Sequence, residues 1–92
     1  MLIAIDGYHG HLATAGLKPL GPDRTYQLWF VRPGGTAASG GTFRVDARGR
    51  AWASITAPIP LDETRLVAVT EETAPGAPVP TGSYLLEAKS WR

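Results

Sequence analysis

Residues 25–32, TYQLWFVR, are the stretch of sequence that decides the fold class. Successive side chains of an extended chain point to opposite faces, and this stretch is apolar on both. One face carries Tyr26, Leu28 and Phe30, and the other carries Trp29 and Val31. A strand of this kind usually lies inside a sheet, with other parts of the chain covering each side. We therefore predict that residues 25–32 form a central strand and that Tyr26 and Trp29 belong to the core.

Short strands separated by turns account for most of the remaining chain. The 92 residues include 11 glycines and 8 prolines, and the runs between them are rich in β-branched and aromatic side chains. Such spacing is typical of an all-β sandwich or barrel. The other predicted strands are residues 2–6, 11–15, 41–46, 50–56, 66–71 and 83–90, with at most one helical turn within residues 61–66. We expect a single domain, residues 1–92, folded as a seven-stranded antiparallel immunoglobulin-like β-sandwich.

A tight turn joins two of these strands. Residues 46–49, DARG, place a glycine where the chain needs a left-handed backbone conformation. Apolar and polar residues alternate on either side, so we predict that residues 41–46 and 50–56 pair as a hairpin. Trp52 lies on the face opposite the apolar residues of its strand, which makes it the best candidate for an exposed aromatic side chain. Trp91, next to last in the chain, is expected to be partly exposed.

The overall composition excludes several classes of function. The formal net charge is +1, so no broad electrostatic attraction to nucleic acid or acidic lipid is expected. The absence of cysteine excludes disulfides, thiolate metal sites and thiol nucleophiles. No apolar run is long enough to span a membrane, and the first residues do not resemble a signal peptide. A domain of this kind that works outside the cytoplasm would need an upstream segment to carry it there.

Two histidines near the N-terminus suggest a metal site at first sight. His9 and His11 are two residues apart, so on one strand both imidazoles would share a face, as in some zinc and copper sites. Asp6 is nearby, but the chain has no other histidine and no cysteine to complete a ligand set. The simpler interpretation is an exposed polar turn between the first two strands, and we assign no metal ligand.

The residues needed for acid–base or nucleophilic catalysis do not come together in the sequence. None of the serines lies in a nucleophile elbow, and these serines are Ser39, Ser54, Ser83 and Ser90. The adjacent carboxylates at residues 62–63 and at residues 71–72 would point to opposite faces of a strand, and we expect them to be solvated charges. We predict that the protein is not an enzyme and assign no catalytic or cofactor-binding residue.

Residues 32–41, RPGGTAASGG, are rich in glycine. They lack the GK[ST] ending of a phosphate-binding loop, and no helix follows them. We expect a flexible connection between strands, whose tip is a candidate site of contact or proteolytic cleavage.

Residues 69–82, VTEETAPGAPVPTG, are rich in proline. A linker is excluded because only about ten residues follow, and these form a strand that the core needs. Pro75 and Pro78 have the PxxP spacing, which is weak support for a proline-binding partner. We predict an ordered connection between the last two strands, stiffened by its prolines.

Several segments in order resemble the C-terminal extracytoplasmic domain of the anti-sigma-K factor family. Together they run through most of the chain, and they are AGLKPL at residues 15–20, RTYQLW at 24–29, SGGTF at 39–43, DARGR at 46–50, VTEET at 69–73 and PVPTG at 78–82. The chain departs from the family pattern at Lys18, at Thr73 and at Pro75-Gly76. These departures affect the backbone conformation of two loops but not their presence.

The resemblance implies an extracytoplasmic regulatory or sensor domain of a transmembrane anti-sigma factor. Such a protein controls an extracytoplasmic-function sigma factor through regulated proteolysis, and its sigma-binding cytoplasmic module and membrane helix are absent from this sequence. The implied partners are the sigma factor and a membrane-associated protease, with no cofactor and no nucleic acid. Two alternatives remain: a stand-alone β-sandwich that binds carbohydrate or protein, and a small metalloenzyme or metal carrier using His9 and His11.

Overall fold

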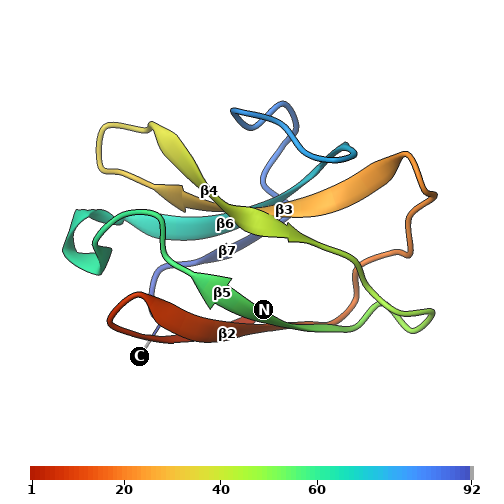
Figure 1. Ribbon diagram of the computed structural model, residues 1–92, viewed down its shortest axis with the longest axis horizontal. Coiled ribbons are helices and arrows are strands. Elements are labelled where there is room, and N and C mark those ends of the chain that lie inside the picture. The colour runs from red at the N-terminus through yellow and green to blue at the C-terminus, as the bar shows by residue number, and fades with distance from the viewer. Residues whose placement is uncertain (92) are drawn as a thin grey trace.

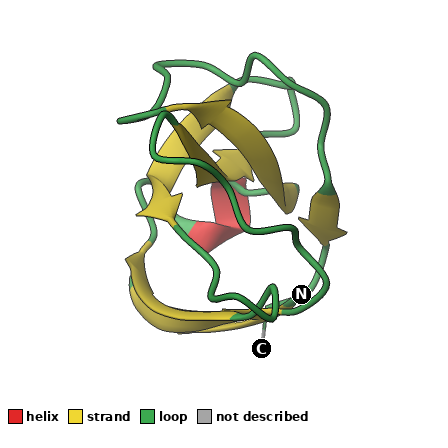
Figure 2. Cartoon of the chain, turned by 90° about the vertical axis from the view of Figure 1, so that its right-hand side faces the viewer, coloured by secondary structure: helices red, strands yellow, loops and turns green. Residues whose placement is uncertain are grey.

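The predicted all-β fold is confirmed. The computed structural model, which describes residues 1–91, consists of two antiparallel sheets facing each other (Figures 1 and 2). The three-stranded sheet has the order β1-β2-β5 and the four-stranded sheet the order β4-β3-β6-β7. In chain order the elements are β1 (Leu2–Asp6), β2 (His9–Thr14), β3 (Arg24–Val31), β4 (Ala37–Phe43), β5 (Ala51–Thr56), a 3-10 turn (Leu61–Glu63), β6 (Leu66–Thr73) and β7 (Leu86–Ala88).

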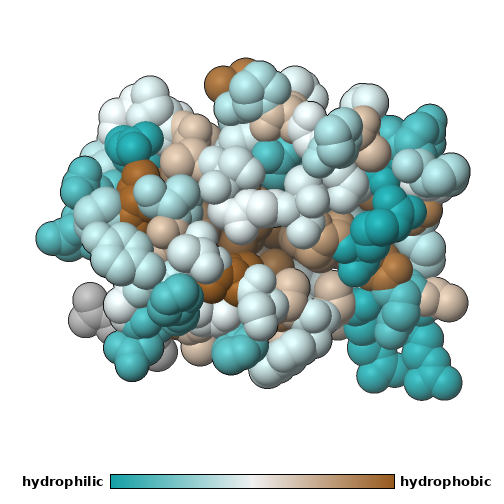
Figure 3. Space-filling view, in the orientation of Figure 1, coloured by the Kyte–Doolittle hydropathy of each residue, from teal (hydrophilic) through white to brown (hydrophobic). Residues whose placement is uncertain are grey.

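Strand β3 is central, as its sequence predicts. It pairs with β4 on one side and with β6 on the other. Tyr26, Leu28 and Phe30 face the three-stranded sheet and join the main core with residues such as Leu12 and Ile55. Figure 3 shows apolar side chains reaching the surface along the middle of the molecule, between the two sheets. Burial of large side chains between two layers is the dominant favourable contribution to folding in a domain of this size.

The opposite face of β3 forms a second, smaller core. Trp29 and Val31 pack there with Leu66 and Ala68 from β6, and Trp29 is completely buried. This face belongs to an outer side of the sandwich, so something other than the second sheet must cover it. The covering segment is the proline-rich connection between β6 and β7, described below.

The predicted hairpin between residues 41–46 and 50–56 is wrong in its pairing. The turn itself forms: the Gly49 amide donates to the Asp46 carbonyl at 2.9 Å, and the Asp46 amide donates to the Arg50 carbonyl at 2.8 Å. Gly49 has φ +76°, the left-handed conformation that the sequence predicts. However, β4 pairs with β3 and β5 pairs with β2, so the turn carries the chain from one sheet to the other. Alternation shows which side chains face the core, but not which strand lies alongside.

The glycine-rich segment is not the flexible connection that we expected. Residues 32–36 form a tight turn, in which the Arg32 amide donates to the Thr36 carbonyl at 2.8 Å, and the rest belongs to β4. Gly40 lies at an irregularity in the pairing of β4 with β3, and a Cβ there would lie 2.7 Å from the ring of Phe30. Glycine is therefore needed for strand β4 to pass over that ring. The glycine in this segment thus serves close packing rather than flexibility.

The position of Trp91 next to the C-terminus suggested that it would be partly exposed, and this expectation is wrong. Its side chain is buried, with 8% of its surface exposed. Its carbonyl accepts a hydrogen bond of 2.9 Å from the Ile5 amide, so the chain at Trp91 lies beside the free edge of β1. Its indole joins the main core. The C-terminal segment thus leaves the four-stranded sheet after β7 and helps to close the three-stranded one.

Candidate functional surfaces

The predicted ordered connection between the last two strands is present. We call residues 74–82 the strap; they lie over the outer face of the four-stranded sheet, in the blue loop at the top of Figure 1. Gln27 of β3 holds the middle of the strap: its Nε2 donates to the Ala77 carbonyl at 3.0 Å, and its Oε1 accepts from the Ala77 amide at 2.9 Å. The same Nε2 lies 2.8 Å from Ser39 Oγ. This side-chain amide therefore pairs with the strap much as a neighbouring strand would.

A buried carboxylate holds the end of the strap. Glu72 is only 1% exposed, and its Oε2 accepts hydrogen bonds from the Thr70 hydroxyl at 2.6 Å and from the Thr81 amide at 3.1 Å. The Thr81 hydroxyl donates to the other carboxylate oxygen. Trp29 Nε1 in turn donates to Thr70 Oγ1 at 2.8 Å. One continuous hydrogen-bonded chain therefore links the central strand β3 to the strap.

The environment of Glu72 favours its charged form. Burial by itself raises the pKa of this carboxyl, but the hydrogen bonds from Thr70, Thr81 and the Gly82 amide together outweigh it and leave the pKa below its ordinary value. The expectation that both carboxylates at residues 71–72 are solvated is therefore wrong for Glu72. Glu71 is on the other face and forms an ion pair with Arg24 at 2.9 Å, so the two neighbours do point in opposite directions.

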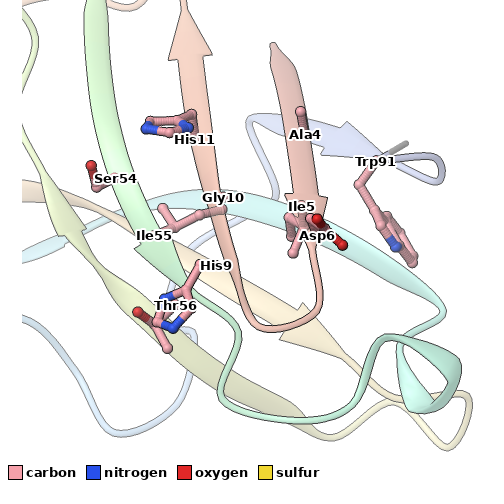
Figure 4. Close-up of a pocket in the computed structure, with 10 residues that line it drawn as sticks. All are labelled: Ala4, Ile5, Asp6, His9, Gly10, His11, Ser54, Ile55, Thr56 and Trp91. Carbon is pink, nitrogen blue, oxygen red and sulfur yellow. The ribbon is translucent and has the colours of Figure 1, made fainter.

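The two N-terminal histidines lie within strand β2 rather than in the turn before it, and both are exposed (Figure 4). They share the outer face of the three-stranded sheet, as their spacing predicts. The ring of His11 stacks on the indole of Trp52, with 5.4 Å between centroids and 27° between planes. Within residues 1–91, no group of three or more His, Asp or Glu side chains is placed to hold a metal ion.

The outer face of the three-stranded sheet is open. Trp52 is 72% exposed there, which confirms it as an exposed aromatic side chain, and Leu2 on β1 is similarly exposed. Two shallow grooves meet on this face, one of about 620 Å³ and one of about 300 Å³, and both are bounded by Ala4 and His11. This is the face on which the structure places aromatic, imidazole, carboxylate and hydroxyl groups together.

The residues that hold the strap were not identified from the sequence. They are Gln27, Thr70, Glu72 and Thr81. One usable signal was Gln27, a polar side chain on the same face as Trp29 in an otherwise apolar strand. A polar group inside such a strand must find a hydrogen-bond partner, and the strap supplies it.

Comparison with known proteins relates the chain to a family. The family model described as anti-sigma-K factor rskA, C-terminal, matches residues 2–84. The match begins with β1 and ends after the strap, just before β7. Neither the curated proteins nor the solved structures give a match. In the described part of the chain, no helix has the length and apolar character needed to cross a bilayer.

Proposed function

The chain belongs to the anti-sigma-K factor C-terminal domain family, and from this membership we propose that it is the extracytoplasmic regulatory domain of a membrane-anchored anti-sigma factor. The family is regulatory, and its partner is a sigma factor. The observation that carries the proposal is the family match over residues 2–84. In the full-length protein, a cytoplasmic module would hold the sigma factor, and one transmembrane helix would join it to this domain. We propose that the domain regulates by binding and gating and does no chemistry.

The proposed mechanism is control of protease access to the segment that leads into β1. The chain enters the sheet at Leu2, and β1 is held by β2 on one side and by the Trp91 carbonyl on the other. A folded body of about 35 × 23 × 17 Å thus begins directly after that segment. Proteases act on locally unfolded chain, so a signal that loosens the domain would expose the segment and start release of the sigma factor.

We also propose that the two sheets form an immunoglobulin-like sandwich. The order β1-β2-β5 facing β4-β3-β6-β7 supports an immunoglobulin-like sandwich, in which the chain repeatedly crosses between sheets. Residues 1–92 would be one domain of the longer membrane protein.

The test uses the full-length protein in its bacterial host, with a reporter gene driven by the sigma factor. Trp29→Ala removes a completely buried side chain, and a loss of about 3–5 kcal/mol would remove much of the free energy of unfolding of so small a domain and raise its unfolded fraction. We expect more cleavage product on an immunoblot and higher reporter output. Tyr84→Ala, which truncates a partly exposed aromatic ring, is the control and should change neither. Unchanged cleavage and reporter output in Trp29→Ala, with the domain shown to be destabilised, would contradict the gating mechanism.

A second candidate function is a stand-alone module that binds carbohydrate or protein. It is favoured by the exposed Trp52 on the open face of the three-stranded sheet. The native gene upstream of Leu2 separates the two candidates. A run of about 20 apolar residues supports the membrane-anchored regulator, whereas a reading frame without one supports the stand-alone module.

A further inference from the structure

We propose that the outer face of the three-stranded sheet is a binding site for a short oligosaccharide, with Trp52 as its aromatic platform. The site consists of the two adjoining grooves on β1, β2 and β5. The inference goes beyond the proposed regulatory role, because it needs neither a membrane nor a sigma factor.

The larger groove has a polar wall and an open floor (Figure 4). Its walls are side chains from two rows across the sheet, and these are Ala4, His11 and Ser54 in one row and Asp6, His9 and Thr56 in the next. Between the rows lies the row of Ile5, Gly10 and Ile55. The side chains of Ile5 and Ile55 point into the core, so the floor of the groove is the backbone of this row. A Cβ at Gly10 would lie 2.2 Å from the Ala4 carbonyl oxygen, so β1 and β2 approach closely there.

The smaller groove supplies an apolar surface. It is lined by Leu2, Ala13 and Trp52, among others, and these three residues lie opposite one another across the three strands. The stacked ring of His11 supports the indole from the neighbouring strand. An indole held in this way loses little freedom when a ligand binds, which favours stacking on its exposed surface.

The chemistry of the two grooves fits a sugar. The carboxylate of Asp6 accepts hydrogen bonds. The imidazoles of His9 and His11 and the hydroxyls of Ser54 and Thr56 can both donate and accept them, as a row of sugar hydroxyls requires. The C–H face of a sugar ring is apolar and can lie on an indole. Thr56 is four positions beyond Trp52 on β5, which corresponds to about 13 Å along the strand. This distance suits a ligand of several rings. The groove volumes fall within the range of about 300–1,000 Å³ found for small-ligand sites.

Other occupants fit less well. Among the described residues that line the two grooves there is no lysine or arginine, so an anionic ligand such as a phosphate has no counter-charge. An acidic lipid surface would be repelled by Asp6 and would favour a protruding apolar face over a groove. Three strands about 4.8 Å apart, with five residues in β1 and six each in β2 and β5, cover only roughly 270 Å², far less than the roughly 800 Å² that one partner contributes to a standard protein interface.

The test is a titration of the isotopically labelled 92-residue chain, followed by nuclear magnetic resonance. The probes are chitotetraose, cellotetraose, maltotetraose and mannotetraose at millimolar concentration. We expect at least one of them to shift the amide signals of β1, β2 and β5 in a saturable way. Trp52→Ala should weaken that binding about tenfold or more, because it removes the stacking platform. Asp6→Asn should also weaken it, since the carboxylate accepts hydrogen bonds more strongly than an amide.

Tyr84→Ala is the matched control, because it removes an exposed aromatic ring outside the three-stranded sheet, and it should leave the binding unchanged. Thermal unfolding of each variant confirms that it is folded. The proposal is overturned if none of the four sugars gives saturable shifts, or if the shifts fall on the four-stranded sheet. It is also overturned if the chain binds phosphatidylglycerol vesicles through Trp52 but binds no sugar.

Discussion

At the scale of single residues, Glu72 shows how a buried charge can serve the structure. Its carboxylate is completely surrounded, yet hydrogen bonds from two threonines and the strap backbone compensate for the loss of water. Its neighbour Glu71 has the same chemistry but lies on the other face, where it pairs with Arg24 and with Lys18 at 3.7 Å. The adjacent pair therefore forms a natural comparison between a buried carboxylate and a more accessible one.

We predict that Glu72→Ala lowers the free energy of unfolding by about 2–3 kcal/mol, because it leaves the buried Thr70 hydroxyl and the part-buried Thr81 amide without their acceptor. Glu71→Ala removes an ion pair that lies partly in solvent, and should cost less than about 1 kcal/mol. Urea denaturation of both variants measures the difference. Equal losses would show that the Glu72 network contributes little to stability.

The same residue predicts a pH dependence. The folded-state pKa of Glu72 lies below the ordinary value of a glutamate, so its contribution to stability is present above that ordinary value and is lost as pH falls through the folded pKa. Asp46, whose pKa is lowered by the Arg50 and Arg48 amides, acts in the same direction. We expect Glu72→Gln to lose less stability than the wild type between pH 7 and pH 3, measured by urea denaturation. Parallel pH profiles would contradict this assignment.

At the scale of elements, the strap covers the outer face of the four-stranded sheet, where no second sheet packs. The face of β3 that carries Trp29 has no second sheet against it, and residues 74–82 take that place. Gln27 is the connection to the middle of the strap and Glu72 the connection to its end. A loop of this length is unusual for a plain hairpin, and its length is explained by the surface that it covers.

We predict that Gln27→Ala loosens the middle of the strap while the sheet stays intact. The Ala77 amide loses its acceptor, so its hydrogen exchange should become roughly tenfold faster or more. Ser39→Ala is the control: it removes one partner of Gln27 but leaves both hydrogen bonds to Ala77 in place. Faster exchange of Ala77 in Ser39→Ala than in Gln27→Ala would show that the strap is held by other contacts.

At the scale of the whole molecule, the two sheets are tied together by segments that cross between them. The turn at residues 46–49 leads from β4 to β5, and the C-terminal segment leads from β7 to the edge of β1. Trp91 lies beyond the residues that match the family model, yet its side chain belongs to the core. Trp91 is therefore part of the folded unit.

We predict that Trp91→Ala lowers the free energy of unfolding by about 3–5 kcal/mol, since it removes a large buried side chain. Trp52→Ala, which removes an exposed indole, should change it by about 0.5 kcal/mol or less. Thermal or urea unfolding compares the two. A cost for Trp91→Ala no larger than that for Trp52→Ala would show that the C-terminal segment does not contribute to the core.

The sequence by itself determined the all-β class, the central position of β3, the left-handed Gly49 and the exposure of Trp52. Each of these depends on local geometry, because a period of two decides which side chains share a face and a tight turn decides where glycine is needed. Only the tertiary structure decided that β4 pairs with β3, that Glu72 is buried and that Trp91 closes the core. These outcomes depend on residues far apart in the chain: Trp29 and Thr70 are 41 positions apart, and Gln27 and Ala77 are 50 apart. No local pattern specifies which distant segment will cover a given face, because that choice is made by the packing of the whole chain.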